Sequence, residues 1–331
     1  MSHTLIVLPD QTAGPIVDAI RGARKSVRVK MFVFSHPALL KAVIDAKKRG
    51  VQVRVMLNPA RRDGEPENEI TRKKLKAVGV EVIDTNPAFD VTHEKSMVVD
   101  DQAAFVQSLN WATKNLTGTR DYAVITTRRK EVDEVIDCFE ADWARRAFPD
   151  HSGTLLIWCN KNGRDRIAQF IDDAKHTLFV QNERYQDSVI IERIVRAKIR
   201  GVKVHVMARP PHKLKKDKLI EGVSGLRIMD DVGIKVHKLK HMKLHGKMLL
   251  ADHSRAIIGS INLAPGSFDS RRELAIEVYK DALVQHLQKV VHHDWKHSYP
   301  LDLSNEGLLE EMTDHKIDAA AELALMAKHR K

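Results

Sequence analysis

Cysteine is nearly missing from this sequence of 331 residues, which contains only Cys138 and Cys159. The two cysteines form no CxxC pair, so they argue against a disulfide framework and against a cysteine-rich zinc site. Aromatic residues are also scarce, at 5% of the chain. That content is thin for a platform that stacks single-stranded nucleic acid, and equally thin for an aromatic membrane anchor. Because the two cysteines form no CxxC pair, we expect both to be buried free thiols.

Long apolar runs are missing as well, since no stretch approaches the roughly 20 residues that a membrane-spanning helix requires. The N-terminal sequence MSHTLIVLPDQTAG predicts a short strand that enters a turn. It lacks the basic start and the longer apolar segment of a signal peptide. These features predict a soluble protein of the reducing cytoplasm.

Basic residues, by contrast, are in excess. The chain carries 55 Lys and Arg against 44 Asp and Glu, which gives a net charge of +11. This charge favours a polyanionic or phosphate-bearing partner, without choosing between nucleic acid and an anionic lipid surface. The 43% of hydrophobic and 30% of charged residues are typical of a globular protein.

The chain contains two copies of one unit. Gly50 recurs as Gly201 at an offset of 151, and the pair Asp142-Trp143 recurs as Asp294-Trp295 at an offset of 152. Such a nearly constant offset between distant landmarks indicates an internal duplication. It predicts three parts: a first repeat at residues 1–150, a second repeat at 151–300, and a helical tail at 301–331.

Each copy alternates strands and helices. Residues 27–34 and 51–57 have the β-branched, apolar composition of strands. Residues 37–50 between them have apolar residues at helical spacing and end at a glycine. A helix that ends in glycine and leads straight into a strand predicts an α/β fold, here two tandem sandwich repeats.

A set of polar residues recurs at an offset of 152 between the two copies. The first copy carries His93, Lys95, Asp100, Ser108, Asn110 and Asp121, and the second carries His245, Lys247, Asp252, Ser260, Asn262 and Glu273. Duplication of a fold alone would preserve the apolar pattern but has no reason to preserve these residues. Their recurrence predicts a functional site.

The spacing of this set predicts a phosphate pocket. In a strand, residues i and i+2 share a face, so each histidine projects beside its lysine. Two such units that face each other across a pseudo-twofold axis would gather two His, two Lys and two Asn into one pocket. Those groups supply donors for a phosphate oxyanion. Asp100 and Asp252, which end the strand, favour a role in the turn rather than in chemistry.

HxK, four residues, Asp, six residues and then GSxN resembles the signature of the phospholipase D superfamily, present here twice. The resemblance covers roughly residues 4 to 300. It implies α/β/α sandwich repeats with the active site at their interface, in a monomer that carries both motifs. It also implies metal-free, cofactor-free phosphodiester exchange, in which His93 becomes a phosphohistidine and His245 protonates the departing alcohol.

The chemistry of the residues agrees with these roles. Histidine has an ordinary pKa near 6.5, so a neutral nucleophile and a protonated acid can coexist at neutral pH, and a bell-shaped pH profile follows. Asp121 and Glu273 can accept from the remote ring nitrogen of a histidine and fix its tautomer. Within the second copy this predicts Glu273 as the group that orients His245. Gln107 departs from the pattern, because it stands where the motif has glycine.

Three histidines, His237, His241 and His245, recur every fourth residue. On a helix this spacing would suggest a metal site. Their surroundings, KVHKLKHMKLHGK, are instead basic and strand-like, which favours a wall that faces phosphate.

The substrate is less well defined by the sequence than the reaction. GSINLAPGSFDSRRELAIEV is similar to the second motif of the branch that contains phospholipases D and cardiolipin synthases, which implies a phospholipid substrate and a peripheral association with an anionic membrane. The alternative is a nuclease of the same superfamily, which the positive charge also suits. A binding module without activity is disfavoured, because both His–Lys pairs are intact.

Overall fold

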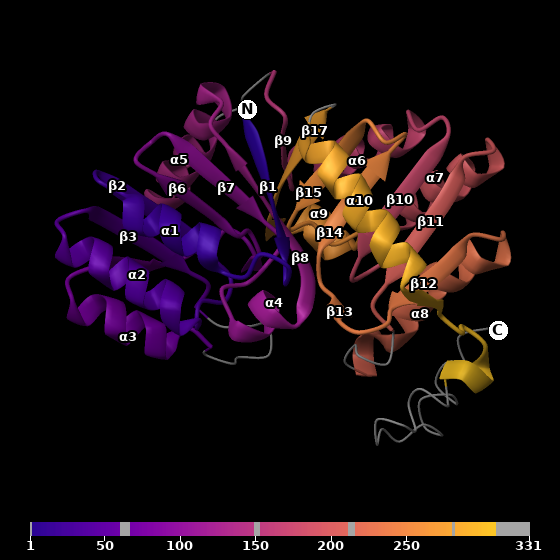
Figure 1. Ribbon diagram of the computed structural model, residues 1–331, viewed down its shortest axis with the longest axis horizontal. Coiled ribbons are helices and arrows are strands. Elements are labelled where there is room, and N and C mark those ends of the chain that lie inside the picture. Colours follow the sequence, from indigo (N-terminus) through magenta and orange to yellow (C-terminus); the bar gives the residue numbers. More distant parts are fainter. Residues whose placement is uncertain (1, 60–66, 149–152, 211–215, 280–281, 309–331) are drawn as a thin grey trace.

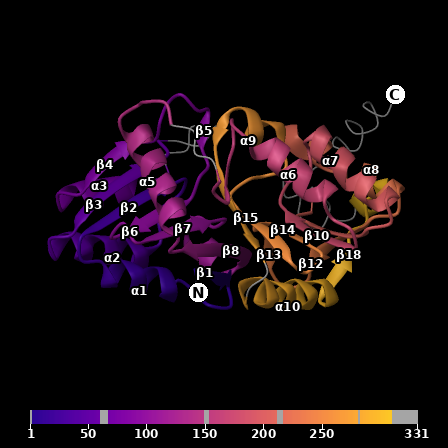
Figure 2. The ribbon, with the colours of Figure 1, turned by 90° about the horizontal axis from the view of Figure 1, so that it is seen from above.

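The computed structural model describes residues 2–59, 67–148, 153–210, 216–279 and 282–308. Two halves lie side by side, each built on a mixed β-sheet with helices packed against it (Figures 1 and 2). The duplicated α/β fold predicted from the sequence is therefore confirmed. The predicted boundary near residue 150 lies in 149–152, outside the described residues, as does most of the predicted tail, 309–331.

The first sheet has parallel strands at one edge and antiparallel strands at the other. Its order is β1 (His3–Leu8), β8 (Thr119–Thr126), β7 (Ala103–Gln107), β6 (Ser96–Val99), β2 (Ser26–Met31), β3 (Gln52–Leu57) and β4 (Glu81–Asp84). Its helices are α1 (Gly14–Gly22), α2 (Pro37–Lys48), α3 (Glu69–Ala77), α4 (Thr113–Thr117) and α5 (Arg129–Trp143).

The second sheet repeats this plan. Its order is β18 (Ser298–Pro300), β12 (Lys235–Leu239), β11 (Lys203–Ala208), β10 (Thr177–Asn182), β14 (Lys247–Ala251), β15 (Arg255–Gly259), β17 (Leu274–Tyr279) and β9 (Leu156–Trp158). Its helices are α6 (Gly163–Asp172), α7 (Ser188–Ile199), α8 (Lys216–Asp231), α9 (Pro265–Asp269) and α10 (Ala282–Lys296).

Helix α2 shows how the sequence sets these elements. Pro37 occupies the first turn, where its missing N–H costs nothing. Leu39, Val43 and Ala46 lie on one face and are buried, so the helix packs against the sheet along its apolar stripe. Gly50 follows with φ +91°, a backbone conformation that glycine adopts readily, and turns the chain into β3.

A shared hydrophobic core joins the two halves. It contains residues from α5 and α10 and from the facing sides of both sheets, among them Val135, Tyr122, Met248 and Leu287. Two short parallel ladders also cross the boundary: β5 (Val91–Thr92) pairs with β16 (Arg271–Arg272), and β13 (Lys243–Leu244) pairs with β8. The halves are thus one packed body at the place where the motifs meet.

Two expectations from the composition can be checked on the described part of the chain. Cys138 and Cys159 are buried and unpaired, as expected. Among the helices that the structure describes, none combines the length and the apolar character needed to cross a membrane.

Candidate active site

Each motif histidine is held by a carboxylate of the opposite half. The β5–β16 ladder pairs Thr92 with Arg272, so that the following residues, His93 and Glu273, lie side by side. Nδ1 of His93 is 2.8 Å from Oε2 of Glu273. The β13–β8 ladder does the same for His245, whose Nδ1 is 2.8 Å from Oδ1 of Asp121.

This crossed arrangement corrects the prediction that Glu273 orients His245 within the second copy. The periodicity of one copy cannot reveal it, because the ladders that set the register connect segments about 125 and 180 residues apart. The crossing also makes each histidine–carboxylate pair depend on the interface between the halves.

The charges of the first pair differ from those of isolated side chains. Burial lowers the pKa of His93 to about 3, although Glu273 opposes the shift. Burial would raise the pKa of Glu273, but His93 and Lys95 outweigh it and hold that pKa at about 2. At neutral pH Glu273 is therefore a carboxylate and His93 a neutral imidazole that donates its Nδ1–H. The lone pair of Nε2 is then free to act as a nucleophile.

The second pair is anchored more firmly on the carboxylate side. Asp121 accepts hydrogen bonds from Oγ of Ser108 at 2.6 Å and from Oγ1 of Thr119 at 2.5 Å. Burial would raise its pKa, but His245 and the other neighbours outweigh it and lower the pKa. Ser260, the counterpart of Ser108, bonds instead to the backbone of Leu274.

The two motif lysines are bound to the backbone of the histidines. Nζ of Lys95 donates to the carbonyl of His93, and Nζ of Lys247 donates to the carbonyl of His245. Burial lowers the pKa of Lys95 well below its usual range, and repulsion from Lys247 adds to this. An anionic phosphate beside Lys95 would oppose that shift and favour its charged form.

The two motif asparagines present unsatisfied groups. Asn110 and Asn262 are buried, yet within the described residues Oδ1 of each has no hydrogen-bond partner. A buried amide without a partner is costly, which is typical of a site that receives a ligand. The side chain of Gln107, the departure from the motif, accepts at Oε1 from Nε1 of Trp111 at 3.0 Å, and its Nε2 has no hydrogen-bond partner among the described residues.

Comparison with known proteins places this chain in a family. Residues 16–143 and 167–295 each match the family described as "Cardiolipin synthase, PLD-like domain". The chain belongs to the phospholipase D superfamily. The resemblance seen in its two motifs is thereby confirmed.

Curated relatives of this phospholipase D superfamily chain are distant. Cardiolipin synthase 1 of Bacillus anthracis is 22% identical over 348 residues, which cover 89% of this chain and 66% of the relative. Cardiolipin synthase B of Salmonella typhi is 25% identical over 344 residues, covering 87% and 79%. The chain thus spans slightly less than two thirds of the Bacillus relative.

Solved structures share the fold. Phosphatidylserine synthase of Haemophilus influenzae aligns with a TM-score of 0.72 at 12% identity, covering 98% of this chain and 92% of that one. Polyphosphate kinase of Porphyromonas gingivalis aligns with a TM-score of 0.71 at 15% identity, covering 91% and 48%. At such identities the likeness shows the architecture alone.

Two aspartates of the superfamily motif hold turns. Asp100 has φ 54° and accepts hydrogen bonds from the backbone N–H groups of Arg24, Lys25 and Ser26 at 2.7 to 3.1 Å. Asp252 has φ 50° and accepts in the same way from the N–H groups of Lys175, His176 and Thr177, at the start of β10, at 2.7 to 2.9 Å. Each therefore ties the strand that carries the lysine to the start of the neighbouring strand.

Asp100→Ala and Asp252→Ala are each expected to lower the free energy of unfolding by about 1–3 kcal/mol, because three backbone donors lose their acceptor. Urea unfolding of each variant measures this change. Asp100→Asn is the matched control, because it keeps an acceptor and tolerates positive φ. An Asp100→Ala variant as stable as the wild type would contradict the role in the turn.

Sequence reasoning missed two buried ion pairs that join the halves. Arg272 binds Asp142 through two hydrogen bonds of 2.8 and 3.1 Å. Arg120 binds Asp294 through two hydrogen bonds of 2.8 and 2.9 Å. The recurrence of Asp-Trp at an offset of 152 could have identified the two aspartates. Each arginine directly precedes a carboxylate of the site in the sequence, and this position could have identified the two arginines.

These arginines also support the histidines through their backbone. The carbonyl of Arg272 accepts from the N–H groups of His93 and Glu94 at 3.0 and 2.9 Å. The carbonyl of Arg120 accepts from those of His245 and Gly246 at 3.2 and 2.7 Å. One residue in each half thus ties a histidine of the other half to a buried aspartate.

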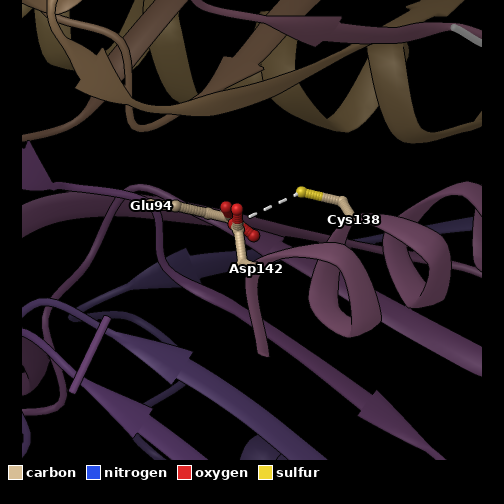
Figure 3. A group of neighbouring side chains, drawn as sticks. All are labelled: Glu94, Cys138 and Asp142. Carbon is tan, nitrogen blue, oxygen red and sulfur yellow. Dashed lines mark hydrogen bonds between the residues drawn. The ribbon is translucent and has the colours of Figure 1, made fainter. Parts of the chain in front are cut away.

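Glu94, Cys138 and Asp142 form the cluster of possible metal ligands that the described residues contain (Figure 3). Nζ of Lys30 lies 2.9 Å from Glu94, 2.7 Å from Asp142 and 3.4 Å from Sγ of Cys138. Burial would lower the pKa of Lys30, but Asp142 and its neighbours outweigh it and raise the pKa. The ammonium ion therefore occupies the position of a cation, and the cluster does not fit a metal.

The histidine-rich approach to the second motif is placed differently from the prediction. His237 stacks on Trp295 with ring centroids 4.0 Å apart, and its Nδ1 lies 2.7 Å from Oγ of Ser298. The ring of His237, which belongs to β12, therefore packs against α10 and β18. The prediction that it belongs to a wall that faces phosphate is wrong.

Proposed function

We propose that this chain is a phosphatidyltransferase that exchanges the alcohol of a phospholipid through a phosphohistidine on His93. The observation that carries the proposal is the pair of crossed contacts, His93–Glu273 and His245–Asp121, which use Nδ1 of both rings. Within the described chain, neither Nε2 makes a hydrogen bond to the protein. Both reactive nitrogens are thus available to a bound diester.

In the first step, Nε2 of His93 attacks phosphorus and the bond from phosphorus to the alcohol oxygen breaks. The departing oxygen takes the proton from Nε2 of His245. Asp121 holds the ring of His245 through Nδ1, and Glu273 stabilises the charge that develops on His93. Lys95, Lys247 and the two asparagines supply donors for the phosphoryl oxygens.

In the second step, an incoming alcohol gives its proton to Nε2 of His245 and attacks phosphorus. The bond from phosphorus to His93 breaks, and the imidazole returns to its neutral form. Water in place of the alcohol gives hydrolysis. No step requires a metal ion, because protonated side chains supply the charge.

A lipid substrate is supported by the names of the relatives, cardiolipin synthases in both cases. The net charge of +11 suits an enzyme that works at an anionic membrane surface. We place it as a peripheral protein on the cytoplasmic side, where its two buried thiols stay reduced, and as a monomer that holds both motifs. A nuclease is the competing function, because the same phosphate chemistry would serve it.

The proposal predicts exchange without metal. Purified protein with excess EDTA is given phosphatidylglycerol vesicles with 1-butanol, or labelled single-stranded DNA, with His93→Ala and His245→Ala as controls. We expect phosphatidylbutanol from the wild type and from neither variant. DNA cleavage without lipid turnover would establish the nuclease instead. Loss of activity in EDTA that a divalent metal restores would refute the metal-free mechanism.

The pH profile is a further expected result. Since the pKa of His93 is lowered to about 3, its neutral form persists as pH falls from 7 to about 4. The acidic limb of kcat/KM set by His93 is thus expected well below the pH 6.5 of an ordinary histidine. Short-chain soluble phosphatidylglycerol avoids titration of a membrane surface. A loss of kcat/KM centred near pH 6.5 and assigned to His93 would contradict the buried, neutral nucleophile.

A further inference from the structure

The two halves of the pocket differ at one matched position. Strands β2 and β10 are followed by Phe32 and Glu183, which correspond at an offset of 151. The ring of Phe32 meets the ring of His93 edge-on at 5.0 Å, and Nζ of Lys95 lies 5.2 Å from its centroid. In the second half, Oε2 of Glu183 lies 3.5 Å from Nζ of Lys247. One lysine thus faces an aromatic ring and its twin faces a carboxylate.

Glu183 is ionised and lies among positive charges. Its side chain is 12% exposed. Burial would raise its pKa, but Lys247, then His245 and Arg209, outweigh it and hold the pKa below its usual range. The phosphate chemistry does not require a carboxylate here, since an anion beside the lysine weakens its attraction for phosphate. The carboxylate of Glu183 is better explained by a role other than binding the phosphate.

Glu183 still has capacity to accept a hydrogen bond. Arg209 binds its Oε1. Lys247 is 3.5 Å from its Oε2, at the outer limit of a hydrogen bond, so a closer donor can bind that oxygen. A carboxylate has about four acceptor positions, and these two contacts leave some of them open.

The chemistry of the reaction determines which part of a substrate comes near Glu183. An in-line displacement puts the nucleophile and the exchanging alcohol on opposite sides of phosphorus. His93 attacks from one side, so the alcohol lies on the side of His245, whose proton it takes. Glu183 belongs to that side, because its carboxylate interacts with His245 and Lys247.

The surrounding charge restricts the kind of alcohol. Lys247, Arg209 and Arg184 act on the single carboxylate of Glu183. Nε of each arginine is buried and has no hydrogen-bond partner in the described part of the chain. Three cations against one carboxylate repel an ammonium group, so an amino alcohol is disfavoured. A neutral hydroxyl can donate to the carboxylate without that repulsion.

We propose that Glu183 is a specificity-determining residue that accepts a hydrogen bond from a second hydroxyl of the exchanging alcohol, so that the enzyme prefers polyols. The proposal rests on the transferase function and adds the class of alcohol to it. The half with Phe32 has no such acceptor at the matched position, so the polarity of the pocket orients the diester. Alcohols with one hydroxyl, and cationic amino alcohols, are poorer acceptors.

Competition between acceptors tests the proposal. Vesicles that contain phosphatidyl-p-nitrophenol, whose leaving group carries no cation, are incubated with the wild type, Glu183→Gln or Phe32→Leu and with glycerol, 1-butanol or ethanolamine at equal concentrations. The measured quantity is the ratio of the products from glycerol and 1-butanol within each variant, which cancels general losses of activity. We expect Glu183→Gln to lower this ratio roughly 10- to 100-fold, the effect of losing a charged acceptor. Phe32→Leu, the matched control, keeps the ratio of the wild type.

Each other outcome contradicts a different statement. An unchanged ratio in Glu183→Gln would mean that Glu183 merely pairs with Arg209, and would overturn the inference alone. Ethanolamine preferred over glycerol by the wild type would overturn it too, because the carboxylate would then select a cation. No lipid turnover by the wild type would overturn the transferase function and this inference with it. If Glu183→Gln does not fold, Glu183→Asp replaces it, and its shorter carboxylate is expected to lower the ratio as well.

Discussion

Replacement of His245 by Asn is expected to trap the covalent intermediate when the leaving group needs no proton. With phosphatidyl-p-nitrophenol, His93 can attack and release p-nitrophenolate without help from an acid. The second step then stalls, because no group takes the proton of the incoming alcohol. We expect a burst of about one equivalent of p-nitrophenolate and then turnover reduced roughly 10²- to 10⁴-fold, the usual contribution of a general acid–base.

His93→Asn is the matched variant, and it is expected to give no burst. The geometry of the two histidines is nearly equal, with 2.8 Å to the carboxylate in both cases. The assignment therefore depends on which ring carries the phosphoryl group, and mass spectrometry of the digested His245→Asn protein locates it. A burst in His93→Asn with the phosphoryl group on His245 would reverse the two roles.

The sequence predicts much of this site because the duplication exposes it. Polar residues that recur among changing apolar ones cannot be explained by packing, so His93, Lys95 and Asn110 stand out with their twins. The strands and helices follow from periodicity, as α2 and β3 show. The pairing of His93 with Glu273 does not follow, because it depends on the β5–β16 ladder between the halves, and those strands have two residues each.

Buried charges were the other limit of the sequence. Lys30 lies in the strand-like run VRVKMFVF and would be expected on an exposed face. It is 1% exposed, because Glu94 and Asp142 neutralise it from two other elements. In the sequence Glu183 is likewise only a polar residue that follows a strand. Its proposed role in specificity depends on its position beside Lys247, which the structure provides. Such groups are recognised from their partners, which a single chain segment does not reveal.

The two buried arginine–aspartate pairs are expected to differ in their effect on stability. In Arg120→Met, Asp294 loses both of its strong hydrogen bonds and keeps the amide of Gln181 at 3.4 Å. In Arg272→Met, Asp142 keeps Lys30 at 2.7 Å and Asn86 at 3.2 Å. An uncompensated buried charge costs about 3–5 kcal/mol, so we expect that loss for Arg120→Met. A loss of about 1–3 kcal/mol is expected for Arg272→Met.

Urea unfolding at several pH values checks this prediction. Burial already raises the folded pKa of Asp294, although Arg120 and Gln181 oppose the shift. Loss of Arg120 is expected to raise that pKa further above the unfolded value near 3.9. Protonation then favours the folded state, so the deficit of Arg120→Met is largest at neutral pH and shrinks as pH falls through the raised folded pKa of Asp294 toward about 4. Adding Asp294→Asn removes the charge and is expected to recover part of the stability. Equal losses for the two arginine variants would show that Lys30 does not compensate Asp142.

The same variants separate the support of the histidines from general stability. The carbonyl of Arg120 holds the N–H groups of His245 and Gly246, so a displaced backbone moves the proposed acid away from the leaving oxygen. We expect Arg120→Met, measured at a temperature where it is fully folded, to lower kcat with little change in KM. With p-nitrophenolate as leaving group the burst should persist, because that step needs no acid. Loss of the burst together with kcat would instead indicate that the whole interface, including His93 and Glu273, has shifted.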